Sequence, residues 1–127
     1  MKFGFDIHGV SDKYPKTFAA MSKALVDAGH EVHVLTGPPW NDRIKKELED
    51  IGITYTHFFS ILDYLKEKGV PITWDDRGRG WADKEHWNVA KAEYCRDNDI
   101  DLHIDDSDEY HEHFTTPYLL MIKRREG

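Results

Sequence analysis

The chain has 127 residues and a single cysteine, Cys95, so it is long enough for one folded domain and has no disulfide framework. It is 39% hydrophobic, as globular proteins are, and no apolar run approaches the roughly 20 residues that span a bilayer. The formal net charge of −7 excludes a broad nucleic-acid surface, which needs clustered lysine and arginine. We therefore expect one domain over residues 1–127, in the reducing cytoplasm and away from membranes.

The first half of the chain predicts strands that alternate with helices. Residues 2–7 form an apolar run that contains Asp6, which is typical of a buried strand. Apolar residues recur at spacings of three and four over residues 15–28, which predicts a helix, and Gly29 marks its end. The further elements expected before residue 70 are a strand at 30–35, a helix at 41–51, a strand at 53–57 and a helix at 59–68.

The second half continues this alternation after an irregular stretch. A short strand at Pro71 to Trp74 is followed by a polar loop. The elements expected next are a helix that ends near residue 98, a strand at 100–104, a short helix from about 108 and a last strand at 118–122. Strands that alternate with helices pair in parallel through right-handed crossovers. The sequence therefore predicts a Rossmann-like α/β fold, a three-layer sandwich with about five mainly parallel strands.

Polar side chains gather where the predicted parallel strands end. Asp6 ends the first strand, Thr36-Gly37 follow the second, and Asp105-Asp106 end a later one. The carboxyl ends of parallel strands share one edge of the sheet, where ligands bind in such folds. One such aspartate would be interpreted as a helix or turn cap, but three at one edge repel each other. A hard divalent cation, usually Mg²⁺, relieves that repulsion.

A lysine on the last long helix is expected to complete this group. Lys91 falls on the apolar stripe of that helix and comes fourteen residues before Asp105. A lysine on a core-facing stripe needs an anion, or must extend to solvent. Lys84, which shares the face and lies nearer the start of the helix, is the alternative.

The order of these motifs resembles the haloacid dehalogenase (HAD) superfamily of phosphohydrolases. The likeness covers most of residues 3–107 and rests on Asp6-Ile7-His8-Gly9-Val10, Leu35-Thr36-Gly37, Lys91-Ala92-Glu93-Tyr94-Cys95 and Ile104-Asp105-Asp106-Ser107. Receiver domains build a similar site, but their acidic pair follows the first strand, so the motif order disfavours them. With no large cap domain visible, the chain looks closest to small, nearly capless, nucleotidase-like members.

The resemblance implies an Mg²⁺-dependent phosphatase. In this family the first aspartate, here Asp6, attacks phosphorus and forms an aspartyl-phosphate that water hydrolyses. The implied metal ligands are Asp6, the backbone carbonyl of His8, Asp105 and, directly or in the outer sphere, Asp106. The implied phosphate-binding groups are Thr36, the amide of Gly37, and Lys91 or its alternative Lys84.

Position 8 departs from the family pattern, which has an aspartate there as the general acid and base. His8 replaces it, and imidazole can transfer protons near neutral pH. Three interpretations stay open: His8 does the acid–base work, the aspartyl-phosphate persists in a slow enzyme, or catalysis is lost. The expected function is hydrolysis of a small phosphorylated substrate, and the alternative is a catalytically silent HAD-like binding or regulatory protein.

Residues 70–86 form a candidate substrate loop that contains Trp74, Arg77, Arg79 and Trp81. Tryptophan can stack on a base and arginine can pair with an anion. The alternative is a surface loop anchored by its tryptophans. Without a large cap, the site would be open to a bulky substrate or to a cap from a partner subunit, so a homo-oligomer is one expectation.

Two other polar groups carry less information. His103, His111 and His113 lie near the acidic pair in the sequence, but His111-Glu112-His113 has no established zinc spacing. A short basic tail, Lys123-Arg124-Arg125, is expected to be solvated.

Overall fold

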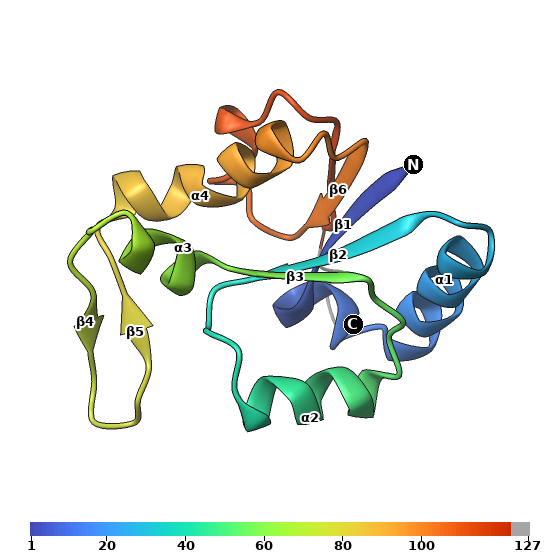
Figure 1. Ribbon diagram of the computed structural model, residues 1–127, viewed down its shortest axis with the longest axis horizontal. Coiled ribbons are helices and arrows are strands. Elements are labelled where there is room, and N and C mark those ends of the chain that lie inside the picture. Colours follow the sequence, from blue (N-terminus) through green and yellow to red (C-terminus); the bar gives the residue numbers. More distant parts are fainter. Residues whose placement is uncertain (123–127) are drawn as a thin grey trace.

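The computed structural model describes residues 1–122, which build a five-stranded sheet with helices on both faces (Figure 1). The strand order is β3-β2-β1-β6-β7, and all neighbours pair in parallel. The strands are β1 (Lys2–Asp6), β2 (Glu31–Thr36), β3 (His57–Ser60), β6 (Leu102–Asp105) and β7 (Tyr118–Leu120). This arrangement confirms the predicted α/β sandwich and its Rossmann-like class.

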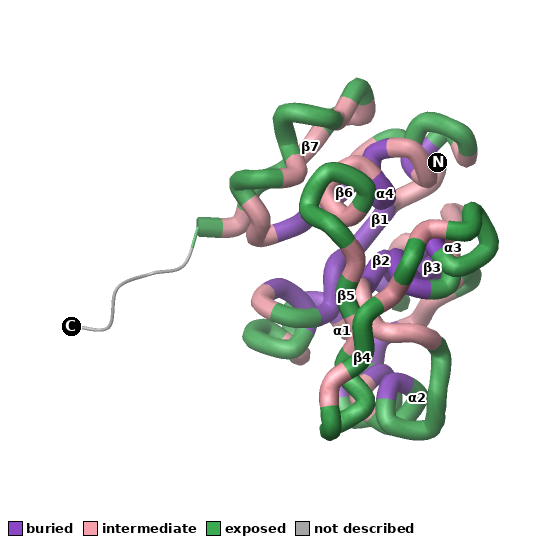
Figure 2. The backbone as a smooth tube through the Cα atoms, turned by 90° about the vertical axis from the view of Figure 1, so that its left-hand side faces the viewer, coloured by how far each residue is buried: buried purple, intermediate pink, exposed green. Residues whose placement is uncertain are grey.

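Four helices make the outer layers. They are α1 (Pro15–Asp27), α2 (Asp42–Ile51), α3 (Ile61–Glu67) and α4 (Lys84–Asp97). Val34 of β2 packs with α1 and α2, whereas the next residue, Leu35, packs with α3 and α4. Successive side chains of a strand point to opposite faces, so one strand serves two cores. Figure 2 shows the result, with β1 and β2 mostly buried and with helices that contain both buried and exposed residues.

Side-chain caps fix where the helices begin, close to the carboxyl ends of the strands. Asn41, Ser60 and Asp83 each accept a hydrogen bond from an amide in the first turn of α2, α3 and α4, respectively. Gly52 ends α2 with φ 78°, a left-handed conformation that glycine adopts readily. The expected helices at 41–51 and before residue 98 are thus present within a few residues of their predicted limits.

The third strand was predicted at 53–57, which is wrong: β3 occupies His57–Ser60, and α3 begins only at Ile61. The stretch 53–56 has the β-branched and aromatic residues of a strand, but only its last residue, Thr56, bonds to β2. The regular ladder starts one residue later, where His57 lies opposite His33. Composition therefore indicated extended chain correctly, but it could not indicate where pairing begins.

The segment after residue 70 contains a β-hairpin rather than one strand and a loop. β4 (Thr73–Trp74) pairs with β5 (Gly80–Trp81) in antiparallel fashion, and the hairpin projects from the body of the domain (Figure 1). The Asp75 carboxylate accepts two backbone amides of the turn, each at 2.9 Å. Gly80 lets the Trp74 ring lie against its backbone, because a Cβ there would be 2.7 Å from that ring.

The end of the described chain is less regular than expected. The short helix predicted from about residue 108 is a 3₁₀ turn at His111–His113, and the last strand stops at Leu120. The basic tail at 123–125 lies outside the described residues. Within residues 1–122, no helix is both long and apolar enough to cross a membrane.

Candidate functional site

An acidic recess of about 230 Å³ lies at the carboxyl ends of β1, β2 and β6. The sequence-predicted residues that line it are Asp6, His8, Thr36, Gly37, Lys91, Asp105 and Asp106. Strand register explains why these residues lie close together. Phe5 of β1 pairs with Ile104 of β6, and Asp6 pairs with Leu35 of β2, so the residues that follow leave the sheet together. The predicted gathering of polar groups at this edge is what the structure contains.

Lys91 is the centre of the recess. Its Nζ donates to Asp6 Oδ1 at 3.0 Å and to Asp105 Oδ2 at 2.7 Å, and its side chain is buried. Burial alone would lower the pKa of Lys91, but the two carboxylates raise it above its ordinary value. The alternative, Lys84, has an 82% exposed side chain that lies 3.6 Å from Glu109. Of the two candidates, Lys91 is the one that the fold brings to Asp6.

The two buried carboxylates differ in their surroundings. Burial, together with the nearby charges of Asp105 and Asp106, raises the pKa of Asp6 to about 7, although Lys91 opposes the shift. Asp105 is also desolvated, which by itself would raise its pKa, but Lys91 and His103 lower it instead. Both donate to Asp105 Oδ2, and the amides of the next two residues donate to Oδ1. Asp105 is therefore held firmly as an anion, while the charge on Asp6 is poorly compensated.

Asp106 completes a group of three carboxylates. Oxygens of Asp6, Asp105 and Asp106 lie within 4.8 Å of one another. Carboxylate oxygens in this number suit a hard divalent cation such as Mg²⁺, whose charge would offset the repulsion among them.

Two further features of the recess suit an anionic ligand. Thr36 is fully buried, and its hydroxyl has no hydrogen-bond partner among residues 1–122. A buried hydroxyl without a partner costs about 1–3 kcal/mol unless a ligand satisfies it. Gly37 follows directly, and the Trp87 ring packs on it so closely that a Cβ would lie 2.9 Å away. The Thr36-Gly37 turn is thus tightly packed on one side of the recess and offers one unused hydrogen-bond donor.

His8 lies at the rim of the recess rather than inside it. Its Nε2 is 2.8 Å from Glu47 Oε2 on α2, and its side chain is 46% exposed. Gly9, with φ 89°, allows the turn to pass against Asp106, because a Cβ at this position would overlap that carboxylate. Sequence reasoning missed the partner Glu47, which is 39 residues away and could not be assigned before the fold was known.

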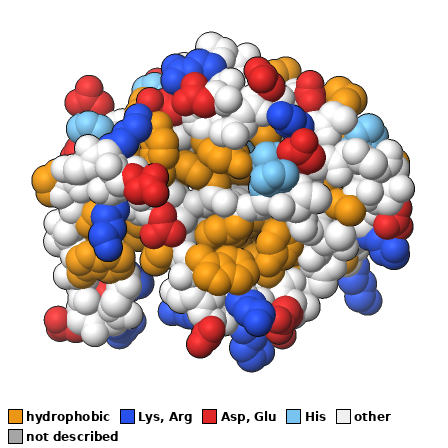
Figure 3. Space-filling model, in the orientation of Figure 1, with side chains coloured by type: hydrophobic (Ala, Val, Ile, Leu, Met, Phe, Trp, Pro, Cys, Tyr) orange, Lys and Arg blue, Asp and Glu red, His pale blue; other side chains and the backbone are white. Residues whose placement is uncertain are grey.

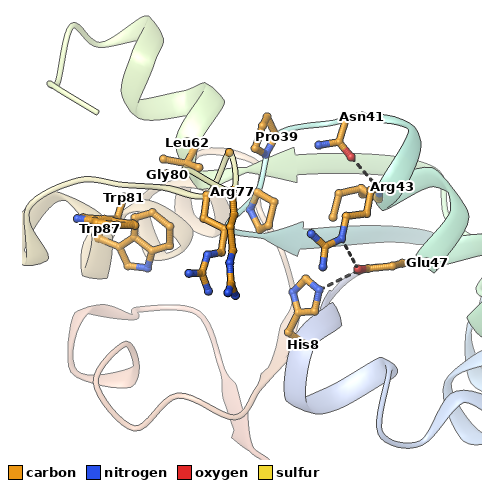
Figure 4. Close-up of a pocket in the computed structure, with 14 residues that line it drawn as sticks. His8, Pro39, Asn41, Arg43, Glu47, Leu62, Arg77, Gly80, Trp81 and Trp87 are labelled. Atoms are coloured by element: carbon orange, nitrogen blue, oxygen red, sulfur yellow. Dashed lines mark hydrogen bonds and ion pairs between the residues drawn. The ribbon is translucent and has the colours of Figure 1, made fainter. Parts of the chain in front are cut away.

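A larger cavity of about 730 Å³, here called the hairpin cavity, lies between the β4–β5 hairpin and α2 (Figure 4). Of the four residues predicted for the substrate loop, Arg77, Arg79 and Trp81 line it. Trp74 does not, and packs on Gly80 within the hairpin instead. The space-filling view shows apolar side chains gathered near the centre of one face and framed by charged groups (Figure 3).

His103 is a buried neighbour of the recess. Its Nε2 lies 2.8 Å from Asp105 Oδ2, and its ring stacks on Phe114 with an interplanar angle of 5°. Burial lowers the pKa of His103, although the Asp105 carboxylate acts in the opposite direction. His103 therefore fixes the orientation of Asp105. Its proximity to the acidic pair was visible in the sequence, but this contact was not.

A second polar group, the histidine cluster, consists of Glu31, His33 and His57 near the starts of β2 and β3. The rings of His33 and His57 stack 4.1 Å apart. His33 is buried, yet both of its ring nitrogens have partners: Nε2 lies 2.8 Å from Glu31 and Nδ1 lies 2.7 Å from Tyr94 Oη. Sequence reasoning missed this cluster. The signal that could have indicated it is a histidine, His33, within a central strand. Its hydrogen bonds account for its burial without an ion.

Comparison with protein families and with curated proteins identifies no relative of this chain. No protein-family model matches this sequence. A search of curated proteins finds no match either. The class that fold and site define is therefore a Rossmann-like α/β domain with an acidic recess at the carboxyl edge of its sheet.

Proposed function

We propose that this chain is an Mg²⁺-dependent phosphohydrolase of the HAD type that acts on a small phosphate ester through Asp6. One observation carries the proposal: a buried lysine, Lys91, joins Asp6 to Asp105 within a group of three carboxylates. The unpartnered hydroxyl of Thr36 supports it, because a phosphate oxygen in the recess could accept a hydrogen bond from it.

The residues take these roles in the proposed reaction. An oxygen of Asp6 attacks phosphorus, the bond to the ester oxygen breaks, and the alcohol leaves with a proton. Water then attacks the aspartyl-phosphate, which releases inorganic phosphate and restores Asp6. Lys91 holds Asp6 in place and offsets the charge of the phosphate, and Thr36 donates to a phosphate oxygen.

The metal would be held by Asp6, Asp105, Asp106 and the backbone carbonyl of His8. When bound, Mg²⁺ would neutralise the carboxylates and allow an anionic substrate to approach. A bound cation would also favour the ionised form of Asp6, which the nucleophile requires.

His8 is proposed as the acid and base, with Glu47 as its positioning partner. The histidine lines both the recess and the hairpin cavity, so it stands where an ester oxygen would leave. Glu47 accepts its Nε2 hydrogen bond and limits the orientations of the ring.

The same contact supports a second candidate, a silent HAD-like binding protein. Within residues 1–122, the His8 side chain hydrogen-bonds to Glu47 and not to a residue inside the recess. If that contact persists with ligand bound, the leaving oxygen has no imidazole to protonate it, and binding remains without turnover.

Hydrolysis of an aryl phosphate with Mg²⁺, followed from acid to alkaline pH, tests the proposal. We expect the wild type to turn over, Asp6→Asn to be inactive, and His8→Asp to change the pH profile. Asp27→Asn, at an exposed side chain on α1, is the matched control and should behave as wild type. A silent wild type together with an active His8→Asp variant would favour the binding protein.

A further inference from the structure

The acidic recess and the hairpin cavity adjoin each other. Three residues line both: His8, Pro38 and Trp87. The recess, at about 230 Å³, suits a phosphate group, whereas the hairpin cavity, at about 730 Å³, has the size of ordinary small-molecule sites. A single ligand could place a phosphate at Asp6 and its remaining part under the hairpin.

The hairpin cavity is basic in an acidic protein. Arg43, Arg77 and Arg79 line it, although the chain has a formal net charge of −7. Arg79 pairs with Asp75 at 2.8 Å, and Arg43 lies 3.7 Å from Glu47.

Arg77 differs from the other two arginines. Among residues 1–122, its side chain makes no hydrogen bond or ion pair, and its backbone amide donates to Asp75. Figure 4 shows its guanidinium pointing into the space between Trp81 and His8. A guanidinium in this position can bind an anionic group in a bidentate manner.

Aromatic and apolar groups form the other wall of the cavity. Trp87 is held by a hydrogen bond from its Nε1 to Tyr110 Oη at 2.7 Å, so its ring is fixed. Trp81 lies beside it in Figure 4 and is 48% exposed, which leaves a face for a ligand ring. Pro39 and Leu62 complete an apolar lining against which a flat ring can pack.

We propose that the hairpin cavity is the second subsite of the same site. Its ligand is a phosphate ester that also carries an aromatic ring and a second phosphate group, such as a nucleoside bisphosphate. This inference rests on the proposed function for the phosphate in the recess. The ring stacks on Trp81, and the second phosphate pairs with Arg77. The neighbouring Arg43 and Arg79 add to the positive field but remain tied to their own carboxylates.

Binding to the Asp6→Asn variant, in excess MgCl₂ and without turnover, tests the subsite. The probes are ribose phosphate, adenosine monophosphate and adenosine bisphosphate, and the readouts are tryptophan fluorescence and calorimetry. We expect affinity to rise at each step, with the second phosphate worth about tenfold, the usual effect of a charged hydrogen bond. The same titrations on Asp6→Ala, also in excess MgCl₂, provide a second arm should Asp6→Asn misfold.

Single variants show which residue produces each of the two gains in affinity, that from the ring and that from the second phosphate. Arg77→Gln, added to either arm, should abolish the gain from the second phosphate and leave the affinity for the monophosphate unchanged. Trp81→Ala should abolish the gain from the ring. Arg96→Gln is the matched control, because this arginine is exposed on α4, pairs with Asp97 and does not line the cavity.

Three outcomes would overturn the inference: equal affinity for the two adenosine phosphates, a second-phosphate gain that survives Arg77→Gln, or no binding of any probe in both arms. The proposed function is judged separately, by aryl phosphate hydrolysis. A wild type that binds the bisphosphate through Arg77 but hydrolyses no ester would reject the hydrolase and retain the subsite.

Discussion

Two polar clusters interrupt the core near opposite ends of β2, and they differ in how completely they satisfy themselves. In the histidine cluster, both ring nitrogens of His33 have partners, and Glu31 serves both imidazoles, at 2.8 Å and 3.5 Å. In the acidic recess, two of the three grouped carboxylates, Asp6 and Asp105, bind the same lysine, and the Thr36 hydroxyl has no partner among the described residues. The histidine cluster is explained by folding alone. The recess gathers carboxylate oxygens around an unused donor, an arrangement that suits a ligand site.

The largest effect on stability should come from removing the lysine of the recess. Lys91→Met leaves Asp6 and Asp105 buried without their cation, and breaking a buried pair typically costs about 3–5 kcal/mol. Urea unfolding without metal measures this cost. Lys84→Met is the matched control, with an exposed side chain and an expected change within about 0.5 kcal/mol. Equal stability of the two variants would mean that Lys91 does not hold the recess together.

Mg²⁺ should stabilise the protein through the recess and not through the histidine cluster. A ligand at a hundredfold excess over its Kd adds about 2.7 kcal/mol to the free energy of unfolding. We expect the melting temperature to rise with Mg²⁺ and to fall again with EDTA. Asp106→Asn should weaken this response, and Glu31→Gln should leave it intact. A response that disappears with Glu31→Gln instead would mean that Mg²⁺ binds at the histidine cluster and not in the recess.

In the histidine cluster, His33→Gln should cost about 1–3 kcal/mol, because it breaks buried hydrogen bonds to Glu31 and Tyr94. It should also weaken the dependence of stability on pH. Burial lowers the pKa of His33; Glu31 opposes this shift, while His57 and Lys2 add to it. A depressed imidazole pKa means that the folded state binds fewer protons than the unfolded chain.

The resulting stability is therefore present above the unfolded value of about 6.5 and is lost as the pH falls through the folded value. Unfolding free energies, measured from neutral to mildly acidic pH, should decline less steeply for His33→Gln than for the wild type. His113→Gln, at an exposed histidine, is the control. Identical slopes for wild type and His33→Gln would mean that His33 is not buried in its neutral form.

The smallest expected effect comes from two glycine-to-alanine variants, which distinguish backbone strain from contact with the recess. Gly9 and Gly29 both have φ 89°, but only at Gly9 would a Cβ meet a side chain, that of Asp106. Both alanine variants should lose about 1 kcal/mol from the left-handed backbone. Gly9→Ala should additionally displace Asp106 and reduce the stabilisation by Mg²⁺. Equal Mg²⁺ responses in the two variants would mean that Asp106 takes no part in metal binding.

Much of the fold follows from local patterns in the sequence. The apolar run around Asp6, the apolar spacing over residues 15–28 and the stop at Gly29 each depend on neighbouring residues, and each predicted an element that the structure contains. β5 was missed because a two-residue strand that begins with glycine has no periodicity. The third strand was misplaced because an extended chain and a paired strand have the same composition.

The recess was predictable in outline because parallel strands bring their ends together, whichever residues lie between them. Contacts that depend on register were not predictable. The bond between His8 and Glu47 joins residues from two elements, and the stacking of His33 on His57 requires that β2 and β3 pair at those positions. The HAD resemblance named the residues of the recess, but it did not supply these partners.

The most direct measurement is mass spectrometry of the chain after acid quench during incubation with an aryl phosphate and Mg²⁺. Our account predicts one phosphoryl group on the peptide that contains Asp6, sensitive to alkali and absent in Asp6→Asn. Hydrolysis without a phosphoryl group on Asp6, or with one on another side chain, would contradict the proposed nucleophile. No phosphorylation and no hydrolysis would contradict the hydrolase itself and leave the recess as a binding site.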